Sequence, residues 1–209
     1  MKLVLASNNA KKLTELRALL APPGLEIVAQ GTLGVDEAEE PHHTFIENAL
    51  AKARHAAART GCAAIADDSG LCVAALGGAP GVDSAHFATI AAAAGGREAR
   101  RLAQDAANNA LLLRRLQGAA DRRARYVSVL VALRSADDPE PLVAAGRWEG
   151  EVLAAARGDG GFGYDPLMFI AALGRSVAEL DAATKNAHSH RALAARQMLA
   201  LMREAWQLG

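Results

Sequence analysis

Two adjacent carboxylates, Asp67 and Asp68, directly follow a short run of small apolar residues, Cys62 to Ala66. The run has the length and composition of a buried strand, which predicts that both carboxylates lie at the strand's polar end. In open α/β sheets, ligands bind outside the carboxyl ends of the strands. Burying two neighbouring carboxylates is unfavourable unless a cation neutralises them, and a divalent ion with oxygen ligands would do so. Ser69 and Gly70 also fit an ordinary strand-ending turn, so this segment alone leaves both interpretations open.

Charge and composition exclude several function classes. The 209 residues carry 23 basic and 23 acidic side chains, so the formal net charge is zero. A non-specific nucleic-acid binder needs a basic excess, whereas a locally basic cleft for a small polyanion is compatible with this composition. No apolar run reaches membrane-spanning length, and residues 1–6 are too short for a secretory segment. We therefore expect a cytoplasmic protein with no nucleic-acid or membrane partner.

Cysteine and linker content indicate one reduced domain. Cys62 and Cys72 are not part of a CxxC motif, which favours reduced thiols in the core over a disulfide or a zinc site. No Pro/Ser-rich linker divides the chain, so we expect a single domain over residues 1–209.

The apolar pattern alternates between strand-like and helix-like segments. Strands are expected at 2–6, 25–29, 62–66, 126–133 and 141–155, and helices at 9–21, 44–60, 97–116 and 190–208. Strand–helix alternation followed by a long hairpin predicts an α/β fold with a mixed sheet flanked by helices. Glycine-rich loops are expected at 77–81 and 157–166.

Local signals set the ends of these helices. Thr44, with Glu47 three residues later, has the spacing of a capping box, and Gly61 marks the end of that helix. Pro22-Pro23-Gly24 would end the first helix. The core stripe expected for the last helix comprises Ala194, Met198, Leu201 and Ala205.

The junction between the first strand and the first helix is a candidate anion site. Backbone N–H groups at a helix N-terminus attract anions, and Lys12 supplies a positive charge one turn into the helix. The glycine spacing of a Walker loop is absent, and such a junction is also an ordinary helix cap, so both interpretations stay open. The junction comprises Ser7, Asn8, Asn9, Ala10, Lys11 and Lys12.

An acidic pair, Glu39-Glu40, precedes the second helix, and Lys52 lies further along that helix. The pair is either a solvated loop or the source of a ligand that joins Asp68 around a metal ion. The neighbouring pair His42-His43 is expected at the surface, because adjacent histidines face apart and make poor zinc ligands.

The segment Gly160–Pro166 combines three glycines with Phe162, Tyr164 and Asp165. Glycine lets the backbone approach a ligand, Phe162 offers a stacking face, and Asp165 offers hydrogen-bond acceptors. The alternative is a hairpin-exit loop whose aromatic residues anchor it in the core. Aromatic residues make up only 4% of the chain, so two in one glycine loop favour a binding site.

A group of hydrogen-bond donors, Lys185, Ser189, His190 and Arg191, lies around the start of the last helix. Cations at a helix N-terminus oppose the helix dipole, so an anionic or carbonyl-rich ligand would explain them.

Taken in order along the chain, these motifs resemble one family, the inosine triphosphate pyrophosphatases, also called Ham1-like proteins. The resemblance covers essentially the whole chain, and an ordered series of motifs is far more specific than any one of them. The matching segments are Ser7–Lys12 with Glu15, Ala38–Glu40, Thr44–Ala49 with Lys52, Ala66–Leu71, Leu76–Gly81, Gly160–Pro166, and Lys185 with Ser189–Arg191.

The resemblance implies a fold and an activity. The fold would be α/β, with a long twisted mixed β-sheet flanked by helices and two lobes with a deep nucleotide cleft. The activity would be hydrolysis of ITP, dITP and XTP to the monophosphate and pyrophosphate, which cleanses the nucleotide pool. The family needs Mg²⁺ and works as a homodimer.

Residue roles follow from the same resemblance. Asp68 would be the catalytic base, and Glu40 and Asp68 would hold the metal, with Glu39 and Asp67 left open as further ligands. The phosphates would contact Ser7, Asn8, Asn9, Ala10, Lys11, Lys12, Lys52 and Ser69. The base and sugar would contact Phe162, Gly163, Tyr164, Asp165, Lys185, His190 and Arg191.

Three positions depart from the family pattern: Ala74, Asp83 and His86 stand where relatives commonly carry Asp, Tyr and Arg. They leave the preference among ITP, dITP and XTP open. Two other classes stay open as well: a Maf-like pyrophosphatase acting on other modified nucleotides, and a non-catalytic nucleotide-binding module. The glycine–aromatic loop and Ser189–Arg191 favour the Ham1-like interpretation over the first. A binding module would have no reason to gather the carboxylates of Glu40 and Asp67-Asp68.

Overall fold

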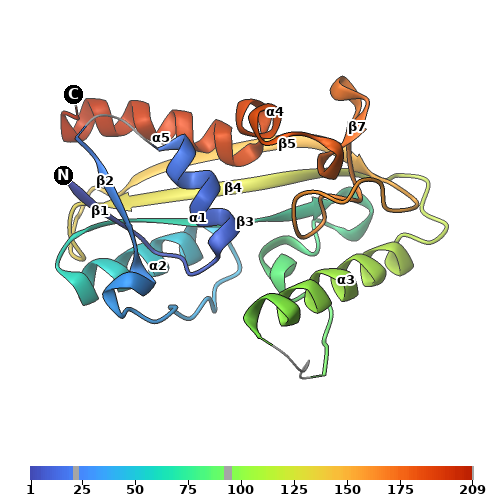
Figure 1. The fold of residues 1–209 in the computed structure, drawn as a ribbon, viewed down its shortest axis with the longest axis horizontal. Coiled ribbons are helices and arrows are strands. Elements are labelled where there is room, and N and C mark those ends of the chain that lie inside the picture. The colour runs from blue at the N-terminus through green and yellow to red at the C-terminus, as the bar shows by residue number, and fades with distance from the viewer. Residues whose placement is uncertain (21–23, 92–95, 209) are drawn as a thin grey trace. The chain divides into compact units, whose positions relative to one another are not determined.

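The computed structural model describes residues 1–20, 24–91 and 96–208, and seven strands of these ranges form one sheet (Figure 1). The strands are β1 Lys2–Leu5, β2 Glu26–Ala29, β3 Ala63–Val73, β4 Arg123–Leu133, β5 Leu142–Val152, β6 Met168–Ile170 and β7 Arg175–Ser176. Their order across the sheet is β2-β1-β3-β4-β5-β6-β7. β1 pairs in parallel with β2 and β3, whereas β6 pairs antiparallel with β5 and β7. The sheet is therefore mixed, which confirms the expected fold class.

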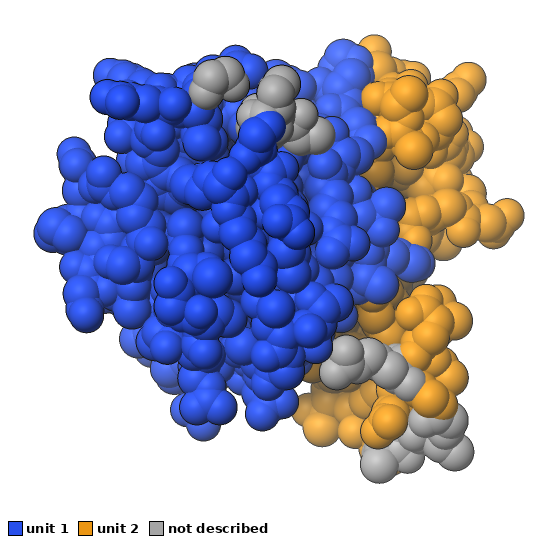
Figure 2. Space-filling view, turned by 60° about the vertical axis from the view of Figure 1, so that its left-hand side comes forward, with its two compact units in different colours: residues 1–68, 128–147, 186–209 blue, residues 69–127, 148–185 orange. Residues whose placement is uncertain are grey.

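The helices are α1 Ala10–Leu19, α2 Phe45–Thr60, α3 Arg97–Arg115, α4 Ala182–His188 and α5 His190–Trp206. No helix in the described ranges combines the length and the hydropathy needed to cross a lipid bilayer. The chain divides into two compact units (Figure 2). Unit 1 comprises residues 1–68, 128–147 and 186–209, and unit 2 comprises residues 69–127 and 148–185, so β3, β4 and β5 each contribute to both.

Unit 1 has a core of aliphatic side chains from its strands and from α1 and α5. Its fully buried members include Leu3, Leu16, Ile65 and Met198. α1 packs against α5 and α2 packs against β1. Figure 1 shows α5 on one side of these strands and α2 on the other. The helices of unit 1 therefore supply side chains to both faces of β3.

Gly146 lets α5 approach β5 backbone to backbone. A Cβ atom at this position would lie 2.0 Å from the main-chain oxygen of His190 and 2.7 Å from the main-chain nitrogen of Ala194. Only glycine fits such a contact without displacement of the helix. The glycine thereby fixes the first turn of α5, where His190 and Arg191 begin the helix.

Unit 2 has a separate core that is richer in aromatic residues. Buried members include Leu71, Leu112, Tyr126, Trp148 and Tyr164. The antiparallel pairs place Phe169 opposite both Glu151 of β5 and Ser176 of β7. Leu112 and Leu116 bring α3 onto this core, so α3 and the loop around Tyr164 share one packed layer.

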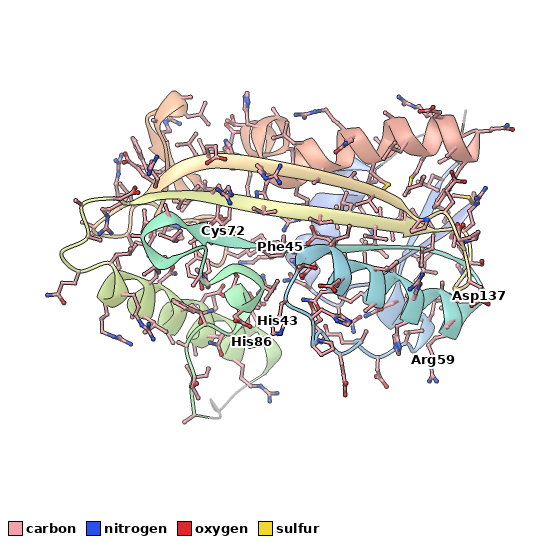
Figure 3. The ribbon with its side chains drawn as sticks, turned by 180° about the vertical axis from the view of Figure 1, so that it is seen from behind. His43, Phe45, Arg59, Cys72, His86 and Asp137 are labelled. Atoms are coloured by element: carbon pink, nitrogen blue, oxygen red, sulfur yellow. The ribbon has the colours of Figure 1, made fainter. Side chains whose placement is uncertain are left out.

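Most expected elements are confirmed, with their ends shifted by a few residues. Thr44 caps α2 by accepting a hydrogen bond from the main-chain nitrogen of Glu47 at 3.3 Å, and Gly61 ends the helix in the left-handed conformation with φ +65°. Figure 3 shows His43 and Phe45 at the N-terminal end of α2. His42 and His43 are exposed, as expected. Cys62 and Cys72 are not joined in a disulfide, but both are only half-buried and are not core residues. The expected stop at Pro22-Pro23 lies outside the described residues.

The expected end of β3 is wrong. The strand does not stop before Asp67 but continues through both carboxylates to Val73, with Ser69 and Gly70 inside it. The apolar residues that follow, Leu71 and Val73, are fully buried and extend the strand into the core of unit 2. The expectation assumed that Asp67 and Asp68 must reach water. Lysine side chains of the protein neutralise both carboxylates instead, so the strand continues through them.

Two further expectations need correction. Ala205 of the expected α5 stripe is exposed, and Met202 is buried in its place, because the helical period of 3.6 carries the buried face from Met198 to Met202. β6, β7 and α4 were not expected, since segments of two to seven residues are too short to show a period.

Asp138 provides a test of the turn that joins β4 to β5. It is buried, and its carboxylate accepts hydrogen bonds from the main-chain nitrogens of Arg134 at 2.8 Å and Glu140 at 3.1 Å. We expect Asp138→Ala to lower the free energy of unfolding at pH 7 by about 1–3 kcal/mol, because two partly buried main-chain donors lose their acceptor. Burial raises the pKa of Asp138, but these hydrogen bonds outweigh it and the net pKa is lowered. The stabilisation is present above the unfolded-state pKa of about 4 and is lost as the pH falls through the folded-state pKa.

The matched control is Asp137→Asn at the neighbouring exposed position, which Figure 3 shows at the same turn. Urea unfolding of both variants at pH 7 and pH 3 measures the effect. Equal losses for the two variants at pH 7 would contradict the assignment.

Candidate active site

Asp67 is a deeply buried charge of unit 1. Its Oδ2 pairs with Lys12 Nζ at 2.8 Å, and its Oδ1 accepts a hydrogen bond from Ser128 Oγ at 2.6 Å and lies 3.6 Å from Arg191 Nε. Burial raises the pKa of Asp67, but the charges of Lys12 and Arg191 and the hydrogen bonds outweigh it and hold the pKa well below its usual value. Asp67 is therefore a permanent anion with both oxygens engaged.

Asp68, the next residue, has a different environment. Its Oδ1 accepts a hydrogen bond from Lys52 Nζ at 2.9 Å. Its Oδ2 is buried and has no hydrogen-bond partner within the described ranges. Burial raises the pKa of Asp68 to about 6, even though Lys52 pulls it down. A carboxylate with a free oxygen and a pKa near the working pH has the properties of a general base.

Strand geometry explains the difference between these neighbours. Successive side chains of a strand point to opposite faces, so Asp67 and Asp68 meet helices on opposite sides of β3. Asp67 meets Lys12 of α1 and Arg191 of α5, whereas Asp68 meets Lys52 of α2. Each carboxylate thus has its own cation, and the repulsion expected between adjacent acids is reduced.

Lys52 joins Asp68 to Glu40. Its Nζ lies 2.7 Å from Glu40 Oε2 and 2.9 Å from Asp68 Oδ1. Burial lowers the pKa of Lys52, but the two carboxylates outweigh it and raise the pKa. For Glu40 the balance has the opposite sign: burial raises the pKa, and Lys52 lowers it by more.

A divalent cation fits this pair of acids. Glu40 and Asp68 supply carboxylate oxygens, the ligands that hard ions prefer, and the unpaired Oδ2 of Asp68 is a donor atom that the protein leaves available. No group of three or more His, Cys, Asp or Glu residues that could hold a metal occurs within the described ranges. Two protein carboxylates would leave the other coordination positions of Mg²⁺ to water and phosphate, as is usual for this ion. Glu39 is exposed.

The junction before α1 is a helix cap. Asn9 accepts a hydrogen bond from the main-chain nitrogen of Lys12 at 3.2 Å, and Ser7 Oγ accepts one from the main-chain nitrogen of Asn9 at 3.2 Å. Ser7, Asn8, Asn9, Lys11 and Lys12 are half-buried and Ala10 is exposed. The cap does not exclude an anion, because the Lys12 ammonium has three donors and Asp67 takes one of them.

In unit 2, Asp165 organises the glycine loop. Its Oδ2 accepts hydrogen bonds from Lys185 Nζ at 2.8 Å and from the main-chain nitrogen of Phe162 at 3.0 Å. Its Oδ1 accepts one from the hydroxyl of Tyr126 at 3.0 Å. Gly161 has φ +74°, and a Cβ there would lie 2.1 Å from the Asp165 carboxylate, so only glycine fits.

The rest of this loop divides between packing and exposure. Tyr164 is buried, and its hydroxyl donates to the main-chain oxygen of Ser84 at 2.9 Å. Phe162 and Gly163 are half-buried, and Lys185 Nζ lies 4.6 Å from the centroid of the Phe162 ring. Part of the Phe162 surface therefore stays accessible, while the Lys185 ammonium makes a cation–π contact with the ring.

The donors expected around the start of α5 are divided between the two units. Lys185, in α4, belongs to unit 2 and pairs with Asp165. His190 and Arg191 belong to unit 1, where Arg191 is almost fully buried and forms ion pairs with Glu15 and Asp67. Ser189 caps α5 by accepting a hydrogen bond from the main-chain nitrogen of Ala192 at 3.2 Å.

Sequence reasoning did not assign a role in this cluster to two residues, Glu15 and Ser128. Glu15 pairs with Arg191, and its spacing from Lys12 by three residues already placed both on one side of α1. Ser128 was detectable as the one hydroxyl in the apolar run from Val127 to Leu133. A lone buried hydroxyl needs a partner, and Asp67 is that partner.

The fold and the cluster define a mixed α/β protein whose central strand carries two buried carboxylates, each paired with a lysine from a flanking helix. A sequence model of the Ham1 family matches residues 3–201, and the chain belongs to this family. The dITP/XTP pyrophosphatases of Methylibium petroleiphilum and Leptothrix cholodnii are 72% and 71% identical to it, over 99% and 100% of both chains. A solved HAM1 protein from Coxiella burnetii is 41% identical, covers 98% of this chain and 100% of its own, and superposes with a TM-score of 0.86.

The opposite pKa shifts of Asp67 and Asp68 can be tested directly. In metal-free protein we expect the Asp68 carboxyl carbon to titrate near pH 6, whereas Asp67 should show no titration above about pH 4. Carbon-13 NMR of aspartate-labelled protein measures both. Because the folded-state pKa of Asp68 is raised, its contribution to stability is present at acid pH and is lost as the pH rises through 6.

Lys52→Met is the informative variant for this titration. Loss of the ammonium should move the Asp68 pKa upward, because the ionised form loses its partner. A titration of Asp68 near 4 in the unsubstituted protein would disprove the tuning described here.

Proposed function

We propose that this protein is an enzyme that hydrolyses the non-standard purine nucleoside triphosphates ITP, dITP and XTP to the monophosphate and pyrophosphate. The observation that supports it best is Asp68, a buried base with one oxygen held by Lys52 and the other available. Full-length relatives that are more than 70% identical and carry the name dITP/XTP pyrophosphatase support the same reaction. The protein would act on the nucleotide pool in the cytoplasm, and its two units would work as one domain, since the family match spans both.

The reaction needs a base, a nucleophile and a leaving group. Asp68 would accept a proton from water, whose oxygen attacks the α phosphorus while the bond from that phosphorus to the α–β bridging oxygen breaks. Pyrophosphate leaves with the bridging oxygen, and the monophosphate keeps the water oxygen. In the metal-free protein, a pKa of about 6 leaves Asp68 mostly ionised at neutral pH, which is the form that accepts a proton.

Positive charge for the phosphates would come from the lysines of unit 1. Lys12 and Lys52 each donate to carboxylates and retain further N–H donors for phosphate oxygens. The phosphates would also contact Ser69 of β3 and the segment Ser7–Lys12, whose main-chain N–H groups lie at the start of α1. Mg²⁺ held by Glu40 and Asp68 would offset phosphate charge and make the attacking water more acidic.

The base and sugar would be bound by residues of the glycine loop, Phe162, Gly163, Tyr164 and Asp165, with Lys185, His190 and Arg191. Phe162 stacks on any purine and does not discriminate. A 6-keto oxygen, present in inosine and xanthosine, matches donor-only side chains such as Lys185, whereas the amino group of adenosine would leave them unpaired. The role of Arg191 rests on the family resemblance, since its guanidinium pairs with Glu15 and Asp67.

The family resemblance also motivates a homodimer. The Ala-rich helices and the loop at Gly77–Gly81 are the surfaces proposed for the contact. Glycines at 77, 78 and 81 have positive φ angles, which gives this loop a compact form.

Product analysis tests the reaction. With Mg²⁺, ITP and XTP should yield IMP or XMP and pyrophosphate in equal amounts, and ATP should react far more slowly. IDP and orthophosphate as first products would refute attack at the α phosphorus. Turnover confined to pyrimidine or methylated nucleotides would indicate a Maf-like enzyme, and binding without turnover would indicate a binding module.

A substitution tests the proposed base. Asp68→Asn keeps the shape of the side chain but removes the base and one metal ligand, so kcat for ITP should fall on the order of a hundredfold or more. Asp137→Asn, at the exposed turn between β4 and β5, is the matched control and should retain full activity. Steady-state turnover at saturating ITP and Mg²⁺ measures both. Near-normal turnover by Asp68→Asn would remove Asp68 from the mechanism.

A further inference from the structure

One face of α3 holds the glycine loop through three successive turns of the helix. Arg101, Asp105 and Asn109 are spaced by four residues, so they form a single stripe along the helix. All three belong to unit 2, as do the loop residues Phe162 and Gly163. None of the three stripe residues belongs to the site described above.

Asp105 and Asn109 together form a clamp on Gly163: they hydrogen-bond its main-chain nitrogen and its main-chain oxygen. Asp105 Oδ2 accepts a hydrogen bond from the main-chain nitrogen of Gly163 at 2.9 Å. Asn109 Nδ2 donates to the main-chain oxygen of the same glycine at 2.8 Å. Gly163 has φ +61°, a conformation that other residues rarely adopt, so the two hydrogen bonds hold the chain at a left-handed position of the loop.

The third contact positions the aromatic ring. The Arg101 guanidinium lies 5.3 Å from the centroid of the Phe162 ring, and Lys185 Nζ lies 4.6 Å from the same centroid. Two cations at this ring restrict its rotation and enrich the local positive charge. Phe162 and Gly163 are adjacent in sequence, so the three stripe residues contact two neighbouring residues of the loop.

Two polar atoms of the stripe lack hydrogen-bond partners among the described residues, which is unusual for residues whose role is only structural. Asn109 Oδ1 and Arg101 Nη2 are buried and have no hydrogen-bond partner within the described ranges. The next residue on α3, Asn108, is the contrast: its Oδ1 accepts from the Ala88 nitrogen at 2.8 Å, and its Nδ2 donates to the Ser84 and Ala85 oxygens. Buried polar atoms without partners weaken a fold, and they concentrate at functional sites.

We propose that Arg101, Asp105 and Asn109 are positioning residues that hold Phe162 and Gly163 in place to receive the purine base. This inference rests on the proposed function and deepens it. A pre-ordered loop pays less conformational entropy when the base binds, so the stripe sets the affinity for the nucleotide. It also sets the preference among purines, because the stacked base must meet its hydrogen-bond donors in one fixed orientation.

The experiment compares an intact nucleotide with its phosphate part alone. Asp105→Ala and Asn109→Ala each remove one arm of the clamp, and alanine favours the helix, so α3 itself is not weakened. Each should raise KM for ITP about threefold to tenfold, the effect of one lost hydrogen bond, while kcat changes little. Inhibition by inorganic tripolyphosphate, which has no base, should keep its inhibition constant. The ratio of kcat/KM for ITP over ATP should narrow.

Conservative and matched variants sharpen the result. Asp105→Asn keeps an acceptor oxygen and should recover most of the affinity lost in Asp105→Ala. Arg101→Ala should raise KM for ITP, whereas Arg100→Ala, at an exposed neighbouring position on α3, should not.

The outcomes separate this inference from the proposed function. If the unsubstituted protein hydrolyses ITP but the alanine variants keep its KM, the positioning role is overturned and the function stands. Equal weakening of ITP and tripolyphosphate would also overturn it, because it would mean a general loss of structure. If the unsubstituted protein does not hydrolyse ITP, the proposed function itself fails.

Discussion

The ion pairs of Asp67 are the interaction on which the rest of unit 1 depends. A buried carboxylate is tolerated only when cations and donors surround it, and Asp67 has Lys12, Ser128 and Arg191. These partners come from α1, β4 and α5, so one side chain of β3 ties together three other elements. The same contacts hold Lys12 of α1 against the side of β3 that carries Asp67. The packing of unit 1 and the proposed phosphate contact of Lys12 therefore depend on the same cluster of charges.

The parts of the fold that the sequence predicts are those with local signals. The ends of α2 follow from the Thr44 cap and from Gly61, whose left-handed conformation disfavours other residues. The length of β3 does not follow from local signals, because Asp67-Asp68 ends a strand in most contexts. Lysines that lie far away in the sequence neutralise the pair, and no pattern within the strand reveals them. Tertiary contacts decide such cases.

The candidate site divides in the same way. The residues alone left the role of Glu40 open, and the family resemblance is what implied one site for Asp68, Glu40 and Lys52. The structure brings these three side chains together through one ammonium. The structural role of Asp165 was only partly predictable from the sequence. Its residue type indicated an acceptor, but its contacts to Tyr126, Phe162 and Lys185 are internal to unit 2 and hold the loop together. The stripe on α3 gave no signal at all, since polar residues at helical spacing resemble any solvated face.

Asp67, Asp68 and Asp165 illustrate how one residue type serves different purposes. Asp67 and Asp165 have both oxygens engaged inside their own units, which makes them anchors. Asp68 has one oxygen engaged and one available, and its pKa is raised to about 6. Burial disfavours the ionised form at both positions of β3, so the difference comes from the number of compensating partners. Asp67 has two cations and a hydroxyl, whereas Asp68 shares its single lysine with Glu40. The incomplete compensation of Asp68, beside a fully compensated Asp67, therefore gives it the raised pKa that its proposed role as a general base requires.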